Sequence, residues 1–176
     1  SDETGVIDLR QKDALGTTNG EVTVSIDHNI DNSGNGLPDW WEAVHGLDAY
    51  APAVGSDDDH DTLDNLLEYA FGGDPNVPDA GQVAPFGTVQ ENDGHSYLTL
   101  TFRRRTPPVP LVYLLEEGSD AVSWDPVDPD LRLFSPPVVL GDGLEQVTVR
   151  GEAPIGEPGS PVRDFMRVKV ESASGP

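Results

Sequence analysis

The sequence predicts a mainly β protein: a C-terminal β-sandwich, preceded by a small two-helix module with acidic loops and by an N-terminal extended arm. Several short apolar stretches separated by turn-rich spacers fill the C-terminal half, which is typical of a sandwich. Upstream, two acidic segments share the side-chain spacing of a loop that wraps a hard cation. We therefore divide the chain into an arm at 1–26, a tandem calcium-loop module at 27–80 and a β-sandwich domain at 81–176.

The sandwich prediction depends on five stretches with strand character. Residues 97–102 alternate apolar and polar side chains with period two, the pattern of a half-buried strand. Gly and Pro are abundant, at 19 and 16 residues, which favours turns and short strands over long helices. The other predicted strands are 111–116, 138–140, 145–150 and 165–170.

Each acidic loop places oxygen-bearing side chains at positions 1, 3, 5 and 9 and a glutamate at position 12. This is the spacing of a 12-residue calcium loop, in which position 7 contributes its backbone carbonyl. In the first loop the predicted metal ligands are Asp31, Ser33, Asn35, Leu37, Asp39 and Glu42. In the second loop they are Asp57, Asp59, Asp61, Leu63, Asn65 and Glu68.

Each loop leads into a short predicted helix. Pro38 suits the first turn of the first helix and Gly46 suits its end, while Gly72 closes the second helix. Loop position 6 is Gly36 in the first loop but Thr62 in the second, and a Thr at positive φ is strained. We therefore expect two unequal sites, the first with good turn geometry and fewer charges, the second with full charge and a strained turn.

Ca²⁺ is the cofactor that these loops predict. Every predicted ligand is an oxygen atom, whereas zinc and copper prefer His or Cys and magnesium demands a stricter octahedron. The two short helices supply only a small shared core, so a cation would contribute much of the module's stability. That core would consist of Trp41, Val44, Leu66, Leu67 and Tyr69.

These residues also carry a resemblance to a known family. The segments 35–42, 45–48 and 65–75 are similar to the calcium-binding thrombospondin type 3 repeats of bacterial surface and secreted proteins. The resemblance covers residues 27–75 and implies secretion and a structural or adhesive role, with a small β-domain downstream. It also implies that an acid before the first loop and the acid of the closing Gly-x-Asp-Pro join the metal cluster, at the positions of Asp27 or Asn29 and of Asp74.

Composition argues against several classes of function. The net charge is −22, and 17 Asp and Glu but no Lys or Arg lie between Lys12 and Arg103, which disfavours nucleic acid and anionic membranes as partners. No apolar run is long enough for a transmembrane helix, so we expect no membrane insertion. Cysteine is absent, so disulfides do not staple the fold. No catalytic motif includes the four His residues, so we expect no enzyme activity.

The sequence is compatible with three functions. The first is a structural subunit, secreted to the cell surface, that self-assembles into a filament when strand-like pieces of the arm, 5–9 and 21–26, add to the sheet of the next copy. The second is a carbohydrate-binding or adhesive module that uses aromatic side chains to hold a glycan, such as Trp40, Tyr97 or Trp124. The third is a C-terminal attachment domain of a larger secreted protein. An extracellular location suits weak loops, since extracellular modules bind calcium at about 10⁻⁴–10⁻³ M.

Overall fold

The computed structural model is mainly β, as the sequence predicts. It describes residues 30–48, 55–106, 109–160 and 165–172. Its strands are β1 (Phe86–Asn92), β2 (His95–Arg105), β3 (Leu111–Gly118), β4 (Asp125–Val127), β5 (Val138–Gly141), β6 (Leu144–Arg150) and β7 (Phe165–Ser172). Its helices are α1 (Asp39–His45), α2 (Asn65–Phe71) and α3 (Ala80–Val83), with a 3-10 turn at η1 (Pro129–Arg132). The predicted arm at 1–26 and the predicted ligands Asp27 and Asn29 lie outside the described residues.

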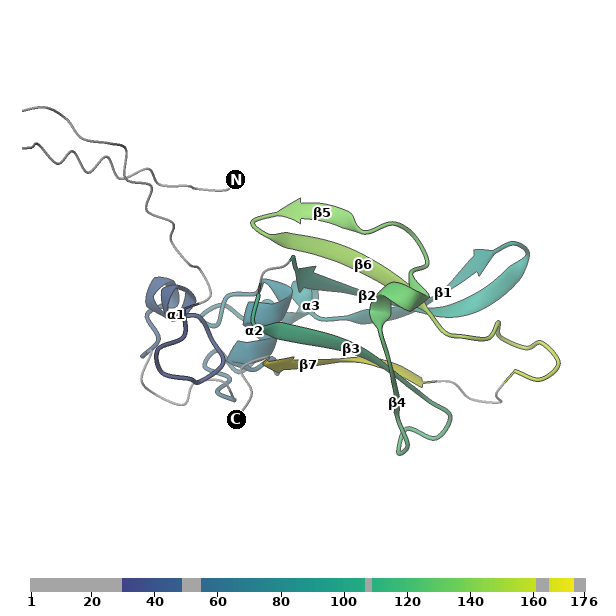
Figure 1. Cartoon of the computed structure of the whole chain (residues 1–176), viewed down its shortest axis with the longest axis horizontal. Helices are drawn as coiled ribbons and strands as arrows, with labels where there is room; N and C mark the ends of the chain where they lie inside the picture. Colours follow the sequence, from purple (N-terminus) through teal and green to yellow (C-terminus); the bar gives the residue numbers. More distant parts are fainter. Residues whose placement is uncertain (1–29, 49–54, 107–108, 161–164, 173–176) are drawn as a thin grey trace, which may run out of the picture.

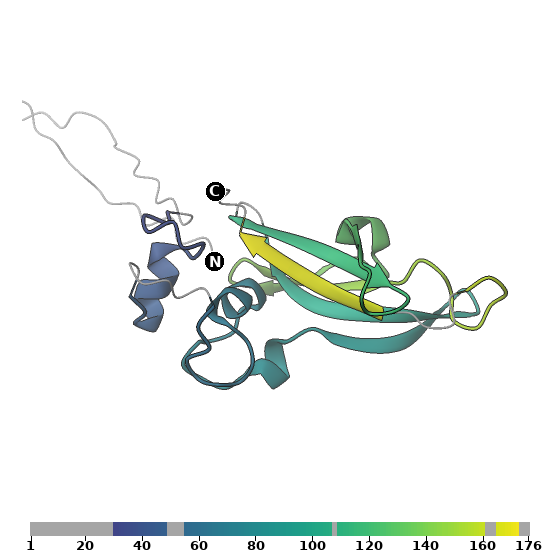
Figure 2. The same cartoon turned by 90° about the horizontal axis from the view of Figure 1, so that it is seen from below.

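The strands form two antiparallel sheets that pack as layers (Figure 2). The larger sheet has the order β1-β2-β6-β5 and the smaller one the order β4-β3-β7. All five predicted strands lie in these sheets, so the expected sandwich-like architecture is confirmed. The sequence did not predict β1, which forms a hairpin with β2 through Asp93 and Gly94, both at positive φ.

One hydrophobic core joins the sheets to the helices. From the larger sheet it takes Leu100, Phe102, Val147 and Val149, and from the smaller sheet Leu111 and Leu115. The helices add Trp41, Tyr69, Ala70 and Phe71. Val44, which we expected in the small core shared by the two helices, is instead 72 % exposed. The helical residues therefore share the core of the sandwich, because α2 lies directly on the sheets and Trp41 of α1 packs against Tyr69 of α2.

The two loop helices have the same length and the same ending. Each spans seven residues, and each ends on a left-handed glycine, Gly46 at φ 73° and Gly72 at φ 74°, as predicted. Pro38 precedes α1 in an extended conformation and does not enter its first turn. Asp64 caps α2 by accepting a hydrogen bond from the Leu67 N–H at 2.9 Å. Both loops therefore deliver their position-12 glutamate at the same point of a two-turn helix.

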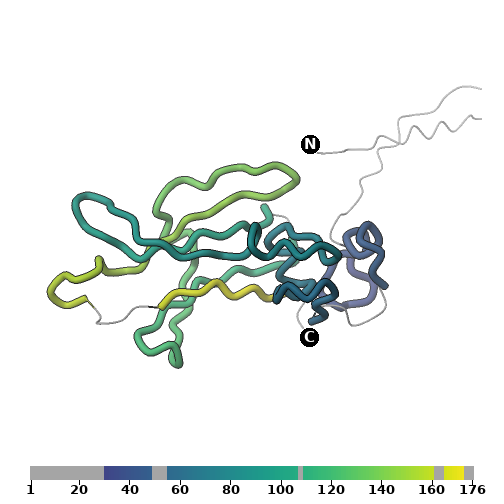
Figure 3. The backbone as a smooth tube through the Cα atoms, turned by 180° about the vertical axis from the view of Figure 1, so that it is seen from behind, coloured from purple at the N-terminus to yellow at the C-terminus, as the bar shows by residue number. Residues whose placement is uncertain are grey.

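Polar contacts hold α2 on both sheets. The Tyr113 hydroxyl donates to the Ala70 carbonyl at 2.8 Å and accepts from the Arg105 N–H at 3.1 Å. The Arg105 guanidinium lies 4.1 Å from the centre of the Tyr69 ring and also donates to the Tyr69 carbonyl. These carbonyls belong to the last turn of the helix, where they lack partners within the helix. Figures 1 and 3 show the result: α1 and α2 sit at one end of the sandwich, opposite the β1–β2 hairpin.

Candidate metal centre

The two acidic loops follow the same backbone path. In both, the residues at loop positions 4 and 6 have positive φ. In the first loop these are Gly34 and Gly36, at 70° and 92°, and in the second they are His60 and Thr62, at 63° and 88°. The strained turn predicted for Thr62 is confirmed, and His60 adds a second residue in a conformation that side chains with a Cβ rarely adopt.

Side-chain oxygens at positions 1, 3 and 5 fold back onto the backbone of each loop. Asp31 accepts from the Gly36 N–H at 2.8 Å, and Asp57 accepts from the Thr62 N–H at 3.1 Å. Equivalent bonds recur at positions 3 and 5 of both loops. The predicted ligands therefore line the inside of both loops, with their oxygens held in place by N–H donors.

The two loops differ in the residue at position 5. In the first loop, Asn35 donates its side-chain amide to Glu42 Oε1 at 2.6 Å. The second loop has Asp61 at this position, and a carboxylate oxygen of Asp61 lies within 4.8 Å of one from Glu68. Glu42 and Glu68 are buried alike, at 0 % and 1 % exposure. An amide therefore engages the buried glutamate of the first loop, whereas a second negative charge faces that of the second.

The predicted ligands at positions 7 and 9 are also placed. Leu37 and Leu63 bury their side chains in the core, and the role of their carbonyls stays a prediction. Asp39 at position 9 accepts from the Asn32 N–H at 2.9 Å and from its side-chain amide. In the second loop Asn65 is buried and donates to Asp58 Oδ2 at 3.3 Å. Position 9 of each loop is thus tied to position 2.

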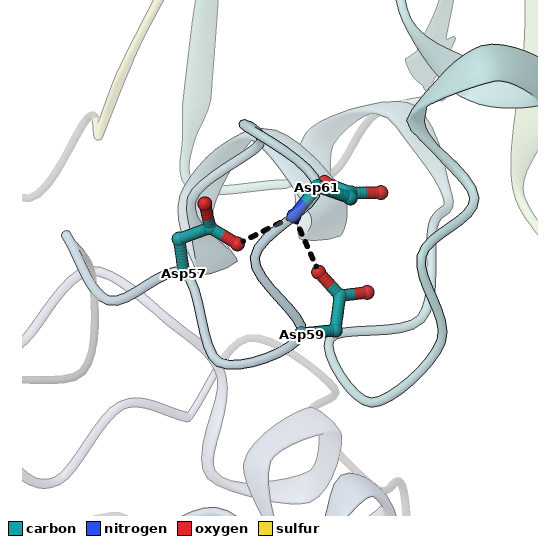
Figure 4. A group of neighbouring side chains, drawn as sticks. All are labelled: Asp57, Asp59 and Asp61. Carbon is teal, nitrogen blue, oxygen red and sulfur yellow. Dashed lines mark hydrogen bonds between the residues drawn. The ribbon is translucent and has the colours of Figure 1, made fainter.

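Carboxylates gather around the second loop. Asp57, Asp59 and Asp61 each have an oxygen within 4.8 Å of the others. In Figure 4 the carboxylates of Asp57 and Asp59 both face the backbone nitrogen of Asp61, whose N–H donates to each at 3.1 Å. A further group of carboxylates with the same separation comprises Asp61, Glu68 and Asp79. Because Asp61 belongs to both groups, five carboxylates form one continuous cluster.

Buried oxygens of this second-loop cluster lack hydrogen-bond partners. They are Asp59 Oδ2, Glu68 Oε1 and Asp79 Oδ1. None of the five clustered acids forms an ion pair within the described part of the chain. Burying a carboxylate oxygen without a donor or a counter-charge is costly, because water no longer solvates its charge. A bound cation is the group that would satisfy such oxygens.

Burial and repulsion perturb the pKa values in the cluster. Burial raises the pKa of Glu68 to about 8, and the charges of Asp59, Asp61 and Asp79 add to this rise. Burial is also the main cause that raises the pKa values of Asp59 and Asp79. The pKa of Asp61 is lowered, chiefly by the hydrogen bond from the Leu63 N–H. At neutral pH the cluster therefore favours binding a positive charge, either a proton or a metal ion.

Asp79 is the member of the cluster that the sequence did not reveal. It lies outside the 12-residue register of the loop, so the loop spacing gives no sign of it. Asp74, which the family resemblance implies as a ligand, accepts from the Asn76 N–H at 3.1 Å and lies in neither carboxylate group. The chain after α2 returns to the loop next to Asp79, where the Ala80 N–H donates to Asp61 Oδ2. The local signal for Asp79 is only that of an Asp at the start of a short helix.

Comparisons with known proteins do not supply a relative. No protein-family model, no curated protein and no solved structure matches the chain. The resemblance to thrombospondin type 3 repeats therefore rests on the residues quoted above and stays a prediction. Among the described residues, no helix has the length and apolar character needed to cross a membrane.

Proposed function

We propose that this chain is an extracellular structural protein that binds Ca²⁺ at its second acidic loop. One observation carries the proposal: the 1 %-exposed Glu68 has an oxygen without a hydrogen-bond partner, within a cluster of five carboxylates. Calcium takes six to eight oxygen ligands in flexible geometry. That preference suits carboxylates that come from a loop, a helix and a later segment of chain.

A structural role agrees with where the cluster lies. Glu68 belongs to α2, and the neighbouring Tyr69 is fastened to the sheets by Arg105. An ion bound to Glu68 would therefore stiffen the connection between the loop and the sandwich core. The same ion would offset the repulsion of a segment that contains no Lys or Arg between Lys12 and Arg103.

Calorimetric titration of the full chain with CaCl₂ tests the proposal. We expect binding by the wild type and no binding at the second loop in an Asp57→Asn, Asp59→Asn double variant. The matched double variant Asp31→Asn, Asp39→Asn of the first loop should keep the second-loop site. MgCl₂ should bind more weakly, because magnesium requires a stricter octahedron. Absence of any binding up to about 10 mM CaCl₂, beyond the range of weak extracellular modules, would refute calcium binding.

A second function, self-assembly, is favoured by an open sheet edge. β5 is an edge strand of the larger sheet, with no described strand beyond it (Figure 3). Its Val138, Val139 and Leu140 are 56 %, 79 % and 46 % exposed, and an exposed apolar edge invites strand pairing. We propose that segment 21–26 of a neighbouring copy, which alternates with period two, adds to this edge. Such a head-to-tail contact does not close, so it would build a filament.

Electron microscopy of the purified chain tests assembly. We expect filaments from the full chain and none after deletion of residues 1–26. A Val139→Lys change on β5 should also prevent filaments, while the equally exposed Val122→Lys, which lies outside the strands, should not. Filaments from the deleted chain, or none from the full chain with calcium present, would contradict this proposal and leave calcium binding unaffected.

The carbohydrate alternative receives less support from the aromatic side chains. The Arg150 guanidinium lies 4.5 Å from the Tyr97 ring centre, and that of Arg167 lies 4.1 Å from the Trp124 ring centre. One stacking face of each ring is thus already occupied by a cation. Trp40 is 38 % exposed and stays a candidate for a glycan. Loss of binding on a glycan array after Trp40→Ala would favour this alternative.

A further inference from the structure

We infer that Asp79 is a further ligand of the second-loop cation, and that the bound ion fastens the chain before β1 to the loop. The inference rests on the proposed function, since it requires a cation at this loop. Asp79 comes from the segment between α2 and α3, so it would extend the site beyond the 12 residues of the loop.

Carboxylates from the loop, from α2 and from the segment before α3 converge at one place. Carboxylate oxygens of Asp61, Glu68 and Asp79 lie within 4.8 Å of one another. The buried oxygens Glu68 Oε1 and Asp79 Oδ1 have no hydrogen-bond partner. Glu68 is 1 % exposed, so water does not solvate its charge. Two partnerless oxygens and a third acid thus surround one small region.

Gly73 identifies the space that these oxygens share. A Cβ atom added to Gly73 would lie 3.0 Å from Asp79 Oδ1 and 3.2 Å from Glu68 Oε1. Gly73 is not among the glycines with positive φ, so its backbone does not require glycine. We attribute the glycine to this confined space, since a methyl group would crowd both oxygens and also the buried Val83, whose Cγ2 lies 3.3 Å from the added Cβ.

A divalent cation beside Gly73 would contact both partnerless oxygens together with Asp61. Hard cations choose oxygen ligands, and calcium accepts carboxylates from separate segments of chain. The ion would also offset the buried negative charges, which no described Lys or Arg pairs with. The site would then be completed by a residue that follows α2 by eight positions.

The ion would add a second link between the loop and the segment that leads into β1. The first link is the Ala80 N–H, which donates to Asp61 Oδ2 at 2.6 Å. Asp79 directly precedes Ala80, the first residue of α3, and α3 leads into the edge strand β1. An ion held by Asp61 and Asp79 would therefore restrain the start of β1.

Asp79→Asn in the full chain tests the ligand, with Asp74→Asn as the matched control. Both variants remove one negative charge from the turn after α2, but only Asp79 lies in the carboxylate group. Calorimetric titration with CaCl₂ should show affinity at least about tenfold weaker in Asp79→Asn, or about 1.4 kcal/mol. Asp74→Asn should stay within about threefold of the wild type.

Gly73→Ala tests the same space while it keeps every carboxylate. A methyl group there should weaken calcium binding about tenfold. Gly81→Ala is its control, because no atom lies within 4 Å of an added Cβ at Gly81. Wild-type affinity in Asp79→Asn, or in Gly73→Ala, would overturn the assignment of Asp79. If the wild type itself binds no calcium, the proposed function fails, which is a distinguishable result.

Hydrogen exchange tests the fastening. Addition of CaCl₂ to the wild type should slow exchange of the backbone amides of β1, Phe86–Asn92, because local opening is then suppressed. Asp74→Asn should keep this protection and Asp79→Asn should lose it, at calcium concentrations that saturate each protein. Equal protection of β1 in Asp79→Asn would overturn the fastening.

Discussion

The first and second acidic loops share one backbone path and differ in how they treat a buried glutamate. In the first loop Asn35 donates an amide hydrogen bond to Glu42 at 2.6 Å. In the second, Asp61 and Asp79 bring further carboxylates to Glu68. Position 5 therefore determines which group faces the buried glutamate. The first loop supplies an amide donor to Glu42 Oε1, although Glu42 Oε2 has no hydrogen-bond partner, whereas the second loop supplies a carboxylate.

The two loops also differ in backbone strain, and here the second loop is the less favourable one. The first uses Gly34 and Gly36 at positive φ, where glycine carries little strain, and the second uses His60 and Thr62. A strained backbone persists only where its surroundings hold it. The second loop has such surroundings, because Asp61 accepts from the Ala80 N–H as well as from its own loop. The more charged loop is therefore also the one whose position-5 carboxylate is bonded to the start of α3.

The largest expected difference between the loops is a pH effect with calcium removed by a chelator. The pKa of Glu68 is about 8 in the folded chain against an ordinary 4.5, so between these values the folded chain keeps a proton that the unfolded chain releases. The free energy of unfolding should therefore fall as the pH rises from 4.5 to 8, by at most about 1.4 kcal/mol per pH unit. Asp59 and Asp79, with pKa values raised above 3.8, add to the fall, while Asp61, with a pKa lowered from 3.8, is ionised in both states across this range and leaves the slope unchanged.

Urea denaturation across this pH range measures that slope. Glu68→Gln should flatten it, and the matched first-loop change Glu42→Gln should flatten it less, although burial raises the pKa of Glu42 as well. Excess calcium should also remove the slope, because a bound ion keeps the carboxylates ionised. If Glu42→Gln flattens the pH profile as much as Glu68→Gln does, the two buried glutamates do not differ as proposed.

Exchanging the position-5 residues gives the next largest effect. Asp61→Asn should weaken calcium binding about 100-fold, or about 2.8 kcal/mol, since it gives the second loop the amide of the first. The reciprocal Asn35→Asp should strengthen binding at the first loop by about tenfold, because it replaces the amide that donates to Glu42. Calorimetry on both variants decides the point. Unchanged affinity in Asp61→Asn would show that position 5 does not set the difference.

A smaller effect on the free energy of unfolding should distinguish the contacts that hold α2 from those that hold α1. Tyr113→Phe removes the hydroxyl that links the Ala70 carbonyl to the Arg105 N–H, and it should lower the free energy of unfolding by about 1–2 kcal/mol. Asn76→Ala removes the exposed bond to the His45 carbonyl at the end of α1, and should lower it by less than about 1 kcal/mol. Thermal or urea unfolding in saturating calcium compares the two. Equal losses of unfolding free energy in the two variants would mean that the contact of α1 stabilises the chain as much as the contact of α2.

The smallest effect concerns backbone strain at loop position 4. His60→Gly should stabilise the chain by up to about 1 kcal/mol, because glycine adopts the positive φ of this residue without a Cβ clash. Gly34→His in the first loop should destabilise the chain by a similar amount. The cost would come from the positive φ alone, because no atom lies within 4 Å of an added Cβ at Gly34. Urea denaturation in saturating calcium measures both. A loss of stability in His60→Gly would indicate that the His60 side chain itself contributes to the loop.

Local patterns predicted most of the fold. The alternation at 97–102 marked β2, and the glycines at 46 and 72 marked the helix ends, because each signal depends on a few neighbouring residues. β1 escaped prediction because most of its side chains are exposed, including Phe86 and Val89 at 56 % and 59 %. A strand without a buried face has no alternation to detect, and it forms through its register with β2.

The candidate site was predicted in part for the same reason. Ligand spacing within a loop is local, so the acids at 57–61 and Glu68 could be read from the sequence. Asp79 depends on the path of the chain after α2, and the exposure of Val44 depends on which face of α1 meets Tyr69. Neither is encoded in a short window, because a seven-residue helix is too short to define its buried face by periodicity alone.

The contacts that hold the last turn of α2 on the sheets affect how quickly the site could exchange its ion. Arg105 and Tyr113 hold the last turn of the helix through contacts that involve none of the clustered carboxylates. We therefore expect an ion to depart while Glu68 keeps its position, so that its residence time follows the motion of the acids at 57–61 and of Asp79. Calcium added back to the calcium-free protein would then find Glu68 already in its binding position, and the ion would rebind without refolding of the chain.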